Sequence, residues 1–482
     1  MQTYSPFNKP IRDLESSDLL NLKHTSEGWY IEYKREAPTS TTIAKSLSAL
    51  ANTYGGWFFV GIDEDSKENP VAGAFPGVER NEVDAVLQRM RKSAADHINP
   101  TPYFETKVLW GPVEQIGLEK DRCVICTWVP QSVTAPHVHK SGVIYRRVSD
   151  ASEPKPENDR FVLDQLWRRA DDIKQQHKKW YDRDPEFSDY EKLKPYVRVM
   201  LVADRWAEQG IWIDANEDEI RSVLATLDGA STIPFDTVHT SAEGFIGRQL
   251  NGNDPNNLSL TWRLGLDLVS DIIIPLPLYE VDTIQSLKIE LDGYAYTDRF
   301  IGILNKYAAK KYRIVDLNYL FNVLRGVAEI QERLCKIAKW ADAYYVKVKI
   351  LNAWRTVPFL DILPVVERFE KNGPPMCLDS VISLPQGSHP ESYTEVSRFP
   401  EIDVEMDIDE SEGAKARVLL QAIAMFSNLA LSFGIPRWIP CENDANLSPF
   451  HKELEMAGLR AIEVQRRRNE RGSSAVGPIS AA

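Results

Sequence analysis

Four charged residues near the N-terminus have the types and spacing that metal-assisted phosphate chemistry requires. Glu32 and Lys34 lie two residues apart in the alternating run WYIEYK, so their side chains share one face of an extended strand. Asp63 and Glu64 directly follow the apolar run WFFVGI. Mg²⁺ and Mn²⁺ prefer carboxylate oxygens from separate segments, and such a cation can activate water against a phosphodiester. Lys34 would then contact the phosphate.

Two other interpretations of these residues stay open. Glu32 and Lys34 also fit a solvated pair on a sheet edge, and the acidic run after WFFVGI also fits an ordinary turn. Glu27 precedes Glu32 by five residues, so it joins a shared site only if the chain turns around Gly28. The residue types alone therefore do not establish a metal site.

The elements that must position these side chains are predicted as strand, helix and strand. Residues 29–34 alternate apolar and polar, residues 41–54 have apolar positions at helical spacing, and residues 57–62 form an apolar run typical of a strand buried on both faces. Gly55 and Gly56 are expected to end the helix. One compact α/β domain is completed by a helix at 81–98 and strands at 104–110, 122–129 and 142–148.

Three motifs in this order resemble the Schlafen-type AlbA-like domain, also called the divergent AAA domain. They are E-x-x-x-x-E-Y-K from Glu27 to Lys34, SALANTYGGWFFVGIDED at 48–65 and VPQSVTAPHVHKSGVIYRRVSDAS at 129–152. The resemblance covers roughly residues 14–170 and is fairly specific for the family, although each motif alone would be weak.

The resemblance implies a fold and an activity. Schlafen proteins that cleave transfer and ribosomal RNA hold a divalent metal with three carboxylates. Carried over by motif, these become Glu27, Glu32 and Asp63, with Glu64 as the alternative for the third, and Mg²⁺ or Mn²⁺ as the cofactor. The resemblance does not by itself imply catalysis, because many bacterial relatives are known only as nucleic-acid- or nucleotide-binding modules of regulators.

Basic side chains in the same region are candidates for contacting nucleic acid. They are Lys34, Arg35, Lys45, Arg146 and Arg147, with Tyr145 and Trp29 as stacking surfaces. Since Arg146 and Arg147 are neighbours on a predicted strand, they face opposite ways and at most one lines a given groove. A scattering of solvated cations on a nearly neutral domain is the alternative.

Three other signals are weaker. Cys123 and Cys126 lie in an apolar strand with their side chains on opposite faces, which disfavours zinc. His137 and His139 are expected to be exposed loop residues rather than ligands. No Gly-Lys-Ser/Thr follows Gly55-Gly56, so a phosphate-binding loop for ATP is not indicated.

The remaining chain divides into regions without a recognised family. We expect residues 1–170 to form the AlbA-like domain, 171–190 a charged linker, 191–465 a mixed α/β domain and 466–482 a disordered tail. Helices are predicted at 194–209, 216–228, 297–311, 316–341, 414–433 and from 449, and strands at 258–263, 286–291, 344–351 and 401–410. Sensing, partner binding and homo-oligomerisation are the roles left open for the C-terminal region.

Composition excludes some classes of protein. The chain has 482 residues, 57 basic and 70 acidic, for a net charge of −13. Residues 1–170 contain 21 basic and 23 acidic residues, so most of the acidity lies in the C-terminal region, which is a poor surface for RNA or DNA. Five scattered cysteines fit a reduced cytoplasm rather than a disulfide framework. No apolar run approaches the ~20 residues of a membrane helix.

The sequence thus predicts a cytoplasmic protein that engages nucleic acid, with a metal-dependent endoribonuclease as the first hypothesis and RNA favoured over DNA. A non-catalytic transcriptional or defence regulator whose domain binds DNA, RNA or nucleotide is the second. Under the first, Glu32→Gln should abolish cleavage with little loss of fold.

Overall fold

The computed structural model describes most of the chain in two compact units. The described residues are 5–7, 9, 11–66, 70–148, 153–206, 211, 213–225, 233, 235–249, 258–306, 311–340, 343–396, 410–435 and 448–475. Unit 1 comprises Met1–Asp182 with Trp206–Ile211, and unit 2 comprises Arg183–Arg205 with Trp212–Ala482. The predicted fold class is confirmed: an α/β N-terminal domain precedes a larger mixed α/β region with C-terminal helices.

Unit 1 contains short strands and three α-helices. Its strands are β1 (Ile31–Lys34), β2 (Gly56–Val60), β3 (Asp63–Glu64), β4 (Ala72–Ala74), β5 (Val78–Glu79), β6 (Ile98–Asn99), β7 (Glu105–Trp110), β8 (Arg122–Val129), β9 (Val138–His139), β10 (Tyr145–Arg146) and β11 (Lys155–Pro156). Its helices are η1 (Ile11–Asp13), η2 (Ser16–His24), α1 (Ser40–Asn52), α2 (Val83–His97), η3 (Glu114–Ile116) and α3 (Arg160–Asp182).

The central sheet of unit 1 has the order β1-β2-β8-β5, and β7 also pairs with β8. Strands β1 and β2 are parallel and connected through α1, and the other pairs are antiparallel. Helices α1 and α2 cover one face, where Phe58 and Val60 are buried, while Trp57 and Phe59 pack into the core on the opposite face. Strand β2 is therefore buried on both faces, as predicted.

A threonine caps the start of α1, and a glycine allows the following strand to approach β1. The Thr39 hydroxyl accepts a hydrogen bond from the Thr42 N–H at 3.3 Å and caps the N-terminus. After the helix, Gly56 has φ of +143° and lies so close to β1 that a Cβ there would stand 2.3 Å from the Tyr30 carbonyl oxygen. Only glycine fits, and this close approach brings β2 alongside β1.

Helix α3 runs through much of the predicted linker. It extends from Arg160 to Asp182, so the first part of the stretch 171–190 is helical, and the change from unit 1 to unit 2 comes directly after its end. Charged residues on its exposed face explain why composition alone indicated a linker.

Unit 2 is built on a larger antiparallel sheet. The strands are β12 (Tyr196–Val202), β13 (Thr237–Ser241), β14 (Gly244–Arg248), β15 (Thr261–Gly265), β16 (Ser270–Pro275), β19 (Tyr344–Leu351), β21 (Val381–Leu384) and β22 (Thr394–Val396). Their order is β13-β14-β15-β16-β12-β19-β21, and β22 also pairs with β19. A smaller sheet has the order β17-β18-β20, with β17 (Leu278–Val281), β18 (Tyr312–Asp316) and β20 (Val357–Phe359).

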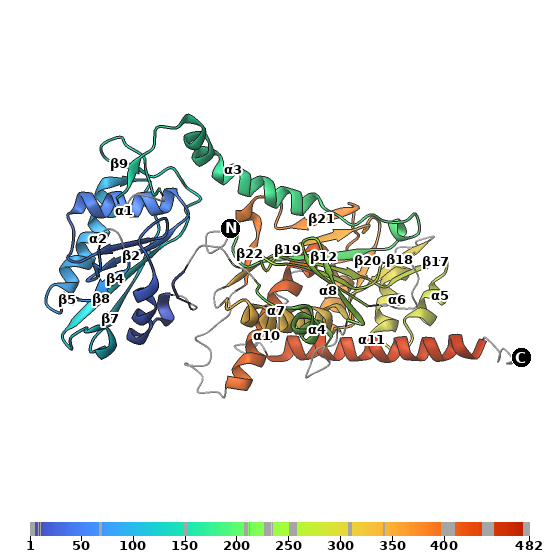
Figure 1. Cartoon of the computed structure of the whole chain (residues 1–482). Helices are drawn as coiled ribbons and strands as arrows, with labels where there is room; N and C mark the ends of the chain where they lie inside the picture. The colour runs from blue at the N-terminus through green and yellow to red at the C-terminus, as the bar shows by residue number, and fades with distance from the viewer. Residues whose placement is uncertain are drawn as a thin grey trace, which may run out of the picture. The chain divides into compact units, whose positions relative to one another are not determined.

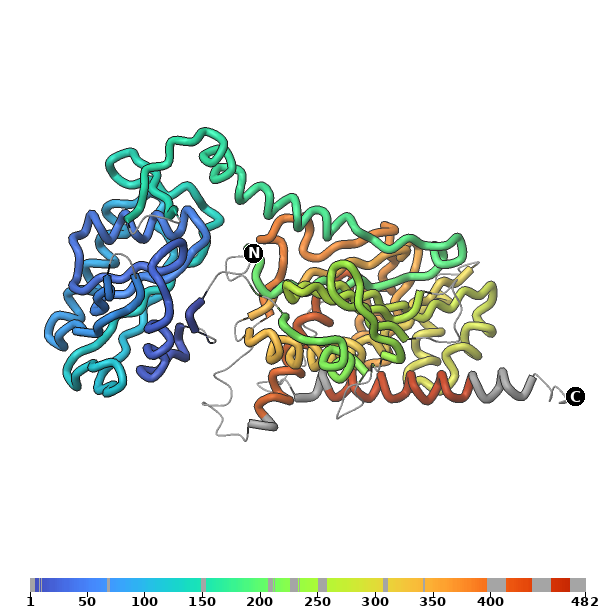
Figure 2. The backbone as a smooth tube through the Cα atoms, viewed as in Figure 1, coloured from blue at the N-terminus to red at the C-terminus, as the bar shows by residue number. Residues whose placement is uncertain are grey.

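The helices of unit 2 include two long ones near the C-terminus. They are η4 (Glu191–Leu193), α4 (Glu217–Ala225), α5 (Ile284–Glu290), α6 (Thr297–Asn305), α7 (Leu320–Ile337), α8 (Leu363–Asn372), η5 (Pro390–Ser392), α10 (Glu410–Ser432) and α11 (Ser448–Ala475). Helix α10 packs on α7 and β19. Figure 2 traces α11 as one long helix. Arg460 on this helix donates to the buried Asp361. Within the described ranges, no helix is long and apolar enough to cross a membrane.

Several element predictions for this region were wrong. Residues 194–209 contain strand β12 rather than a helix, because Val197, Val199 and their neighbours form a strand buried on both faces. Residues 286–291 lie largely in α5, whose N-terminus is capped by Thr283. Helix α11 continues to Ala475, so the tail predicted as disordered from 466 is helical in its first part. Of the predicted strand 401–410, residues 401–409 lie outside the described residues and Glu410 begins α10.

A buried charge network ties the start of unit 2 to its sheet. Asp184, just after α3, accepts from Arg198 Nη1 at 2.9 Å and from Lys349 Nζ at 2.7 and 2.6 Å. Arg198 also donates to both oxygens of Asp271. The side chains of Arg198 and Lys349 are 1% and 4% exposed, so their charges depend on these carboxylates.

Candidate functional site

The candidate site lies between β1 and α1, where the predicted carboxylates gather. On β1, Ile31 and Tyr33 face the core opposite the helices, and Glu32 therefore faces α1. The strand is covered on this side as well, so Glu32 is only 1% exposed. The alternative interpretation of Glu32 and Lys34 as a solvated pair on a sheet edge is therefore wrong.

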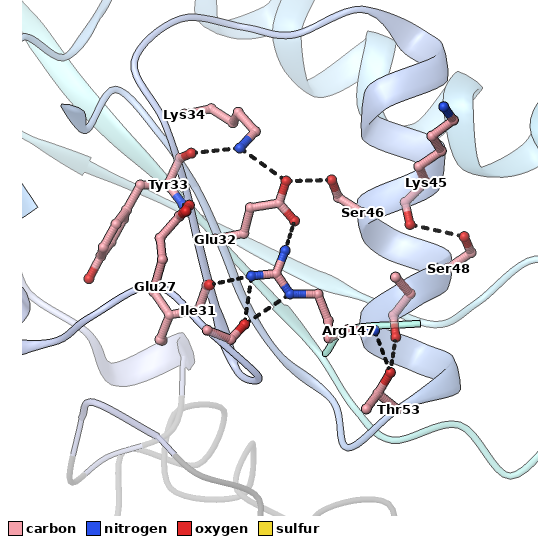
Figure 3. Close-up of polar contacts among 12 residues, drawn as sticks. Glu27, Ile31, Glu32, Tyr33, Lys34, Lys45, Ser46, Ser48, Thr53 and Arg147 are labelled. Carbon is pink, nitrogen blue, oxygen red and sulfur yellow. Dashed lines mark hydrogen bonds and ion pairs between the residues drawn. The ribbon is translucent and has the colours of Figure 1, made fainter. Parts of the chain in front are cut away.

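Glu32 is engaged through both carboxylate oxygens (Figure 3). Oε1 accepts from Ser46 Oγ of α1 at 2.7 Å and lies 3.1 Å from Lys34 Nζ. Oε2 accepts from Arg147 Nη1 at 3.0 Å. A carboxylate held by a buried guanidinium, an ammonium and a hydroxyl is well compensated for its loss of water.

Arg147 joins the motifs that carry the family resemblance. Its side chain is 0% exposed, and it donates to the carbonyls of Gly28 at 2.9 and 2.6 Å and of Ile31 at 2.9 Å, besides Glu32. Its backbone N–H donates to Thr53 Oγ1 at 2.9 Å. Arg147 is thus a buried link, and the structure does not place it on a surface where nucleic acid could reach it.

Glu27 folds back toward Glu32, as the site requires. The Gly28 N–H donates to the Ile31 carbonyl at 3.1 Å, which closes a turn, and Glu27 Oε1 accepts from the Tyr33 N–H at 2.5 Å. Oε2 is buried without a hydrogen-bond partner. Burial raises the pKa of Glu27 to about 8, with Glu32 and Glu64 adding to the rise, against the opposing effects of Lys34 and the Tyr33 N–H.

Asp63 and Glu64 differ in their surroundings. Asp63 Oδ2 accepts from Arg35 Nη1 at 2.7 Å, and this pair lies at the surface. Glu64 is among the charges that act on Glu27, whereas Asp63 is not. The register of β3 against β4 shifts between the two residues. Glu64 therefore contributes to the pKa rise of Glu27, whereas Asp63 is held by Arg35.

The carboxylates do not form a ready-made metal centre. Within the part of the chain that the structure describes, no group of three or more His, Cys, Asp or Glu side chains is arranged to hold a metal. Glu32 is occupied by Arg147, Lys34 and Ser46, so it does not fit as a ligand in this arrangement. The unpartnered Oε2 of Glu27 would fit a cation once the carboxyl loses its proton, which its raised pKa of about 8 retains near neutral pH.

The predicted nucleic-acid contacts differ in availability. Lys34 is 24% exposed and donates to the Tyr33 carbonyl at 2.9 Å. Arg35 pairs with Asp63, and Arg146 pairs with Glu157 at 2.8 Å. Lys45 lies 5.2 Å from the centre of the Tyr145 ring and forms no ion pair with any described residue. Lys34 and Lys45 are thus the better placed of the five.

Sequence reasoning missed residues that position this region. Asn52, at the end of α1 in the motif ANT, donates to the carbonyls of His137 at 2.9 Å and Tyr145 at 3.0 Å and accepts from the His137 N–H at 2.7 Å. Its place in the motif was the available signal. Arg169 of α3 donates to the carbonyls of Asn52 at 2.9 Å and Ser132 at 2.8 Å, with longer contacts to Ala51 and Thr53, and so closes the C-terminus of α1.

The structure also shows where the two histidines and the two cysteines with weaker signals lie. His137 and His139 are buried, 0% and 4% exposed, so their prediction as exposed loop residues was wrong. Burial is the first cause that lowers the pKa of each. Cys123 and Cys126 point into the two separate cores on either side of β8, as the strand period predicted.

Comparison with known proteins assigns the first part of the chain to a family. Residues 27–156 match the family "Schlafen, AlbA_2". No curated protein matches. A solved structure, the DIP2311 protein from Corynebacterium diphtheriae, is 17% identical over 34% of this chain, with a TM-score of 0.20, and the match spans 36% of that protein. At that TM-score it supports no statement on fold or function. Residues 27–156, a segment of the 482-residue chain, are a Schlafen AlbA_2 domain.

Proposed function

We propose that the Schlafen AlbA_2 domain binds nucleic acid at the end of β1, as the binding module of a regulator. The observation that carries this is Lys34. Its ammonium group is the partly exposed member of a network that is otherwise buried, and the network fixes it in place through Glu32 and the Tyr33 carbonyl. A preorganised cation at a strand end suits a phosphate group.

The three partners that already contact the Glu32 carboxylate favour phosphate binding over metal-dependent catalysis. A metal ligand must leave lone pairs free, and the three donors on Glu32 use both of its oxygens. Displacing Arg147 would leave a buried guanidinium without its carboxylate, which is costly. The domain is therefore best suited to bind a phosphate without first binding metal.

A second candidate function, metal-dependent endoribonuclease, has one observation in its favour. Glu27 Oε2 is buried without a partner, and Glu64 lies within its electrostatic range. Glu27 and Glu64 are the residues that would hold Mg²⁺ or Mn²⁺, and the cation would supply activation of water. Lys34 would hold the phosphate beside it, and RNA rather than DNA would be the substrate.

Both candidates are tested with the full chain, its Glu27→Gln variant and, as a matched control, the exposed Glu36→Gln. Each protein is incubated with total transfer RNA and with single-stranded DNA, first in Mn²⁺ and then in EDTA. Binding that persists in EDTA without cleavage is expected. Cleavage in Mn²⁺ that Glu27→Gln loses and Glu36→Gln keeps would establish the nuclease. If the full chain binds neither transfer RNA nor single-stranded DNA, the proposal is refuted.

Glu27→Gln is preferable to Glu32→Gln for this test. Glu32 neutralises Arg147, so its replacement removes a structural charge as well as a candidate ligand. The expectation that Glu32→Gln leaves the fold nearly intact is not supported by this geometry.

A further inference from the structure

A second group of polar side chains gathers beside Lys45 of α1. It consists of Lys45 on α1, His97 at the end of α2, His139 on β9 with the adjacent Lys140, and Tyr145 on β10. We refer to these five residues as the α1 cluster. Lys45 directly precedes Ser46, the residue that donates to Glu32, so the α1 cluster begins one residue from the site already described.

The members of the α1 cluster contact one another. Lys140 Nζ lies 2.8 Å from His97 Nε2, and the rings of His97 and His139 meet edge to face with centres 6.1 Å apart. The His139 and Tyr145 rings are 5.7 Å apart in the same manner, and Lys45 Nζ stands 5.2 Å from the centre of the Tyr145 ring. Tyr145 and His139 thus connect the two lysines.

The two lysines of the α1 cluster have no carboxylate partner among the described residues. Neither Lys45 nor Lys140 forms an ion pair with any residue that the structure describes, whereas Arg35, Arg146 and Arg147 each have a carboxylate partner. Burial, and then His97, Lys45 and Lys140, lower the pKa of His139, and no carboxylate is among these causes. Helix α1 has no acidic residue along its length. Asp96, next to His97, pairs with neither lysine.

Two ring nitrogens in the α1 cluster lack partners. His97 accepts through Nε2 from Lys140, because an ammonium has only donors, so its proton is assigned to Nδ1. His139 Nδ1 accepts from the Ser141 N–H at 3.2 Å, which assigns its proton to Nε2. Both N–H groups are buried without an acceptor. Because these N–H groups are buried, they do not contact a ligand at the surface, but their partial positive charge adds to that of the two lysines.

We propose that the α1 cluster is a second phosphate-binding position, at which Lys45 and Lys140 contact the backbone of a single-stranded nucleic acid whose path begins at Lys34. This inference rests on the proposed function, because it extends the same binding surface along α1. The exposed Lys140 and half-buried Lys45 supply the charge that contacts phosphate, and His97 and His139 beside them bring no negative charge that would oppose it.

The test measures how nucleic-acid affinity depends on salt. The full chain, Lys45→Gln, Lys140→Gln and the double variant are titrated against a fluorescein-labelled single-stranded RNA and a DNA of the same sequence, across a range of NaCl concentrations. Each lost phosphate contact should flatten the plot of log affinity against log salt by about 0.7, and the double variant by about 1.4. The loss should be equal on RNA and DNA, since both carry phosphates.

The control is Lys120→Gln, an exposed lysine that precedes the start of β8, whereas the loop bearing His139 follows the end of that strand. It should leave the slope unchanged. A double variant that behaves like Lys120→Gln while the full chain still binds would overturn this inference alone. A loss on only one of the two nucleic acids would overturn phosphate recognition. Failure of the full chain to bind would refute the proposed function, and the inference with it.

Discussion

At the scale of single residues, Glu27 couples folding to pH. Its pKa rises from an ordinary value of 4.5 to about 8 on folding, chiefly through burial. Between these values the folded state keeps a proton that the unfolded chain has released. The contribution of the protonated Glu27 carboxyl to the free energy of unfolding is therefore fully present below pH 4.5 and is lost as pH rises through about 8.

We expect the melting temperature of the full chain to fall more steeply between pH 5.5 and 8.5 than that of Glu27→Gln, which has no carboxyl proton to lose at this position. Thermal unfolding followed by circular dichroism at several pH values measures the difference. Glu36→Gln should match the parent chain. Identical pH slopes in the parent and in Glu27→Gln would show that the buried carboxyl does not hold its proton.

Glu32 and Arg147 form a buried pair whose disruption should be costly. Removal of one partner leaves the other charge buried and unpaired, so Glu32→Gln is expected to lower the free energy of unfolding by about 3–5 kcal/mol. Urea unfolding of the full chain measures the loss.

Arg147→Met and the double variant complete a mutant cycle with Glu32→Gln. Since Arg147 also serves the carbonyls of Gly28 and Ile31, the double variant should recover part of the loss and not all of it. Strict additivity of the two single losses would mean that the pair has no coupling energy.

At the scale of elements, Asp184 fastens the segment after α3 to the sheet of unit 2. Asp184→Asn removes the carboxylate from Lys349 and one of two carboxylates from Arg198. Because the Asp184 side chain is 32% exposed, water offsets part of this loss, and we expect a decrease of about 2 kcal/mol in the free energy of unfolding.

The exposed Asp189, which pairs with Lys192 three residues later, is the matched control for Asp184. Asp189→Asn should leave the free energy of unfolding essentially unchanged, because water screens this exposed pair. Equal effects of the two substitutions would mean that the buried network does not fasten the segment.

The elements of unit 1 were largely predictable because their signals are local. The apolar run at 57–62, the helical spacing at 41–54 and the glycines between them each depend on a few neighbouring residues. Strand β12 was missed because a strand buried on both faces has no alternation, and its apolar run also fits a helix. Capping by Thr283 explains why α5 forms where a strand was predicted.

The candidate site was only partly predictable. The turn that returns Glu27 and the burial of Glu32 depend on contacts with Arg147, more than a hundred residues away in the chain. Charge in a sequence gives no sign of burial, so Arg147 and the two histidines resembled surface residues. Asp63 and Glu64 lie at a register shift between β3 and β4, which no local pattern indicates.

At the scale of the whole molecule, charge is distributed unequally between the N-terminal domain and the C-terminal region. Residues 1–170 are nearly neutral, with 21 basic and 23 acidic residues, and the proposed binding surface uses the local cations Lys34, Lys45 and Lys140 rather than overall charge. The acidic composition of the C-terminal region makes it a poor candidate for the nucleic-acid surface. Sensing, partner recognition and homo-oligomerisation by that region remain predictions.

The contact between Arg169 and the end of α1 determines which N-terminal fragment of the chain keeps this helix capped. The family match ends at 156, but Arg169 lies beyond it on α3 and supplies the guanidinium for the carbonyls of Asn52 and Ser132. A fragment ending at 156 would leave that helix terminus open to water. A separately expressed domain should therefore retain α3 to Asp182, so the boundary for expression lies beyond the boundary of the family match.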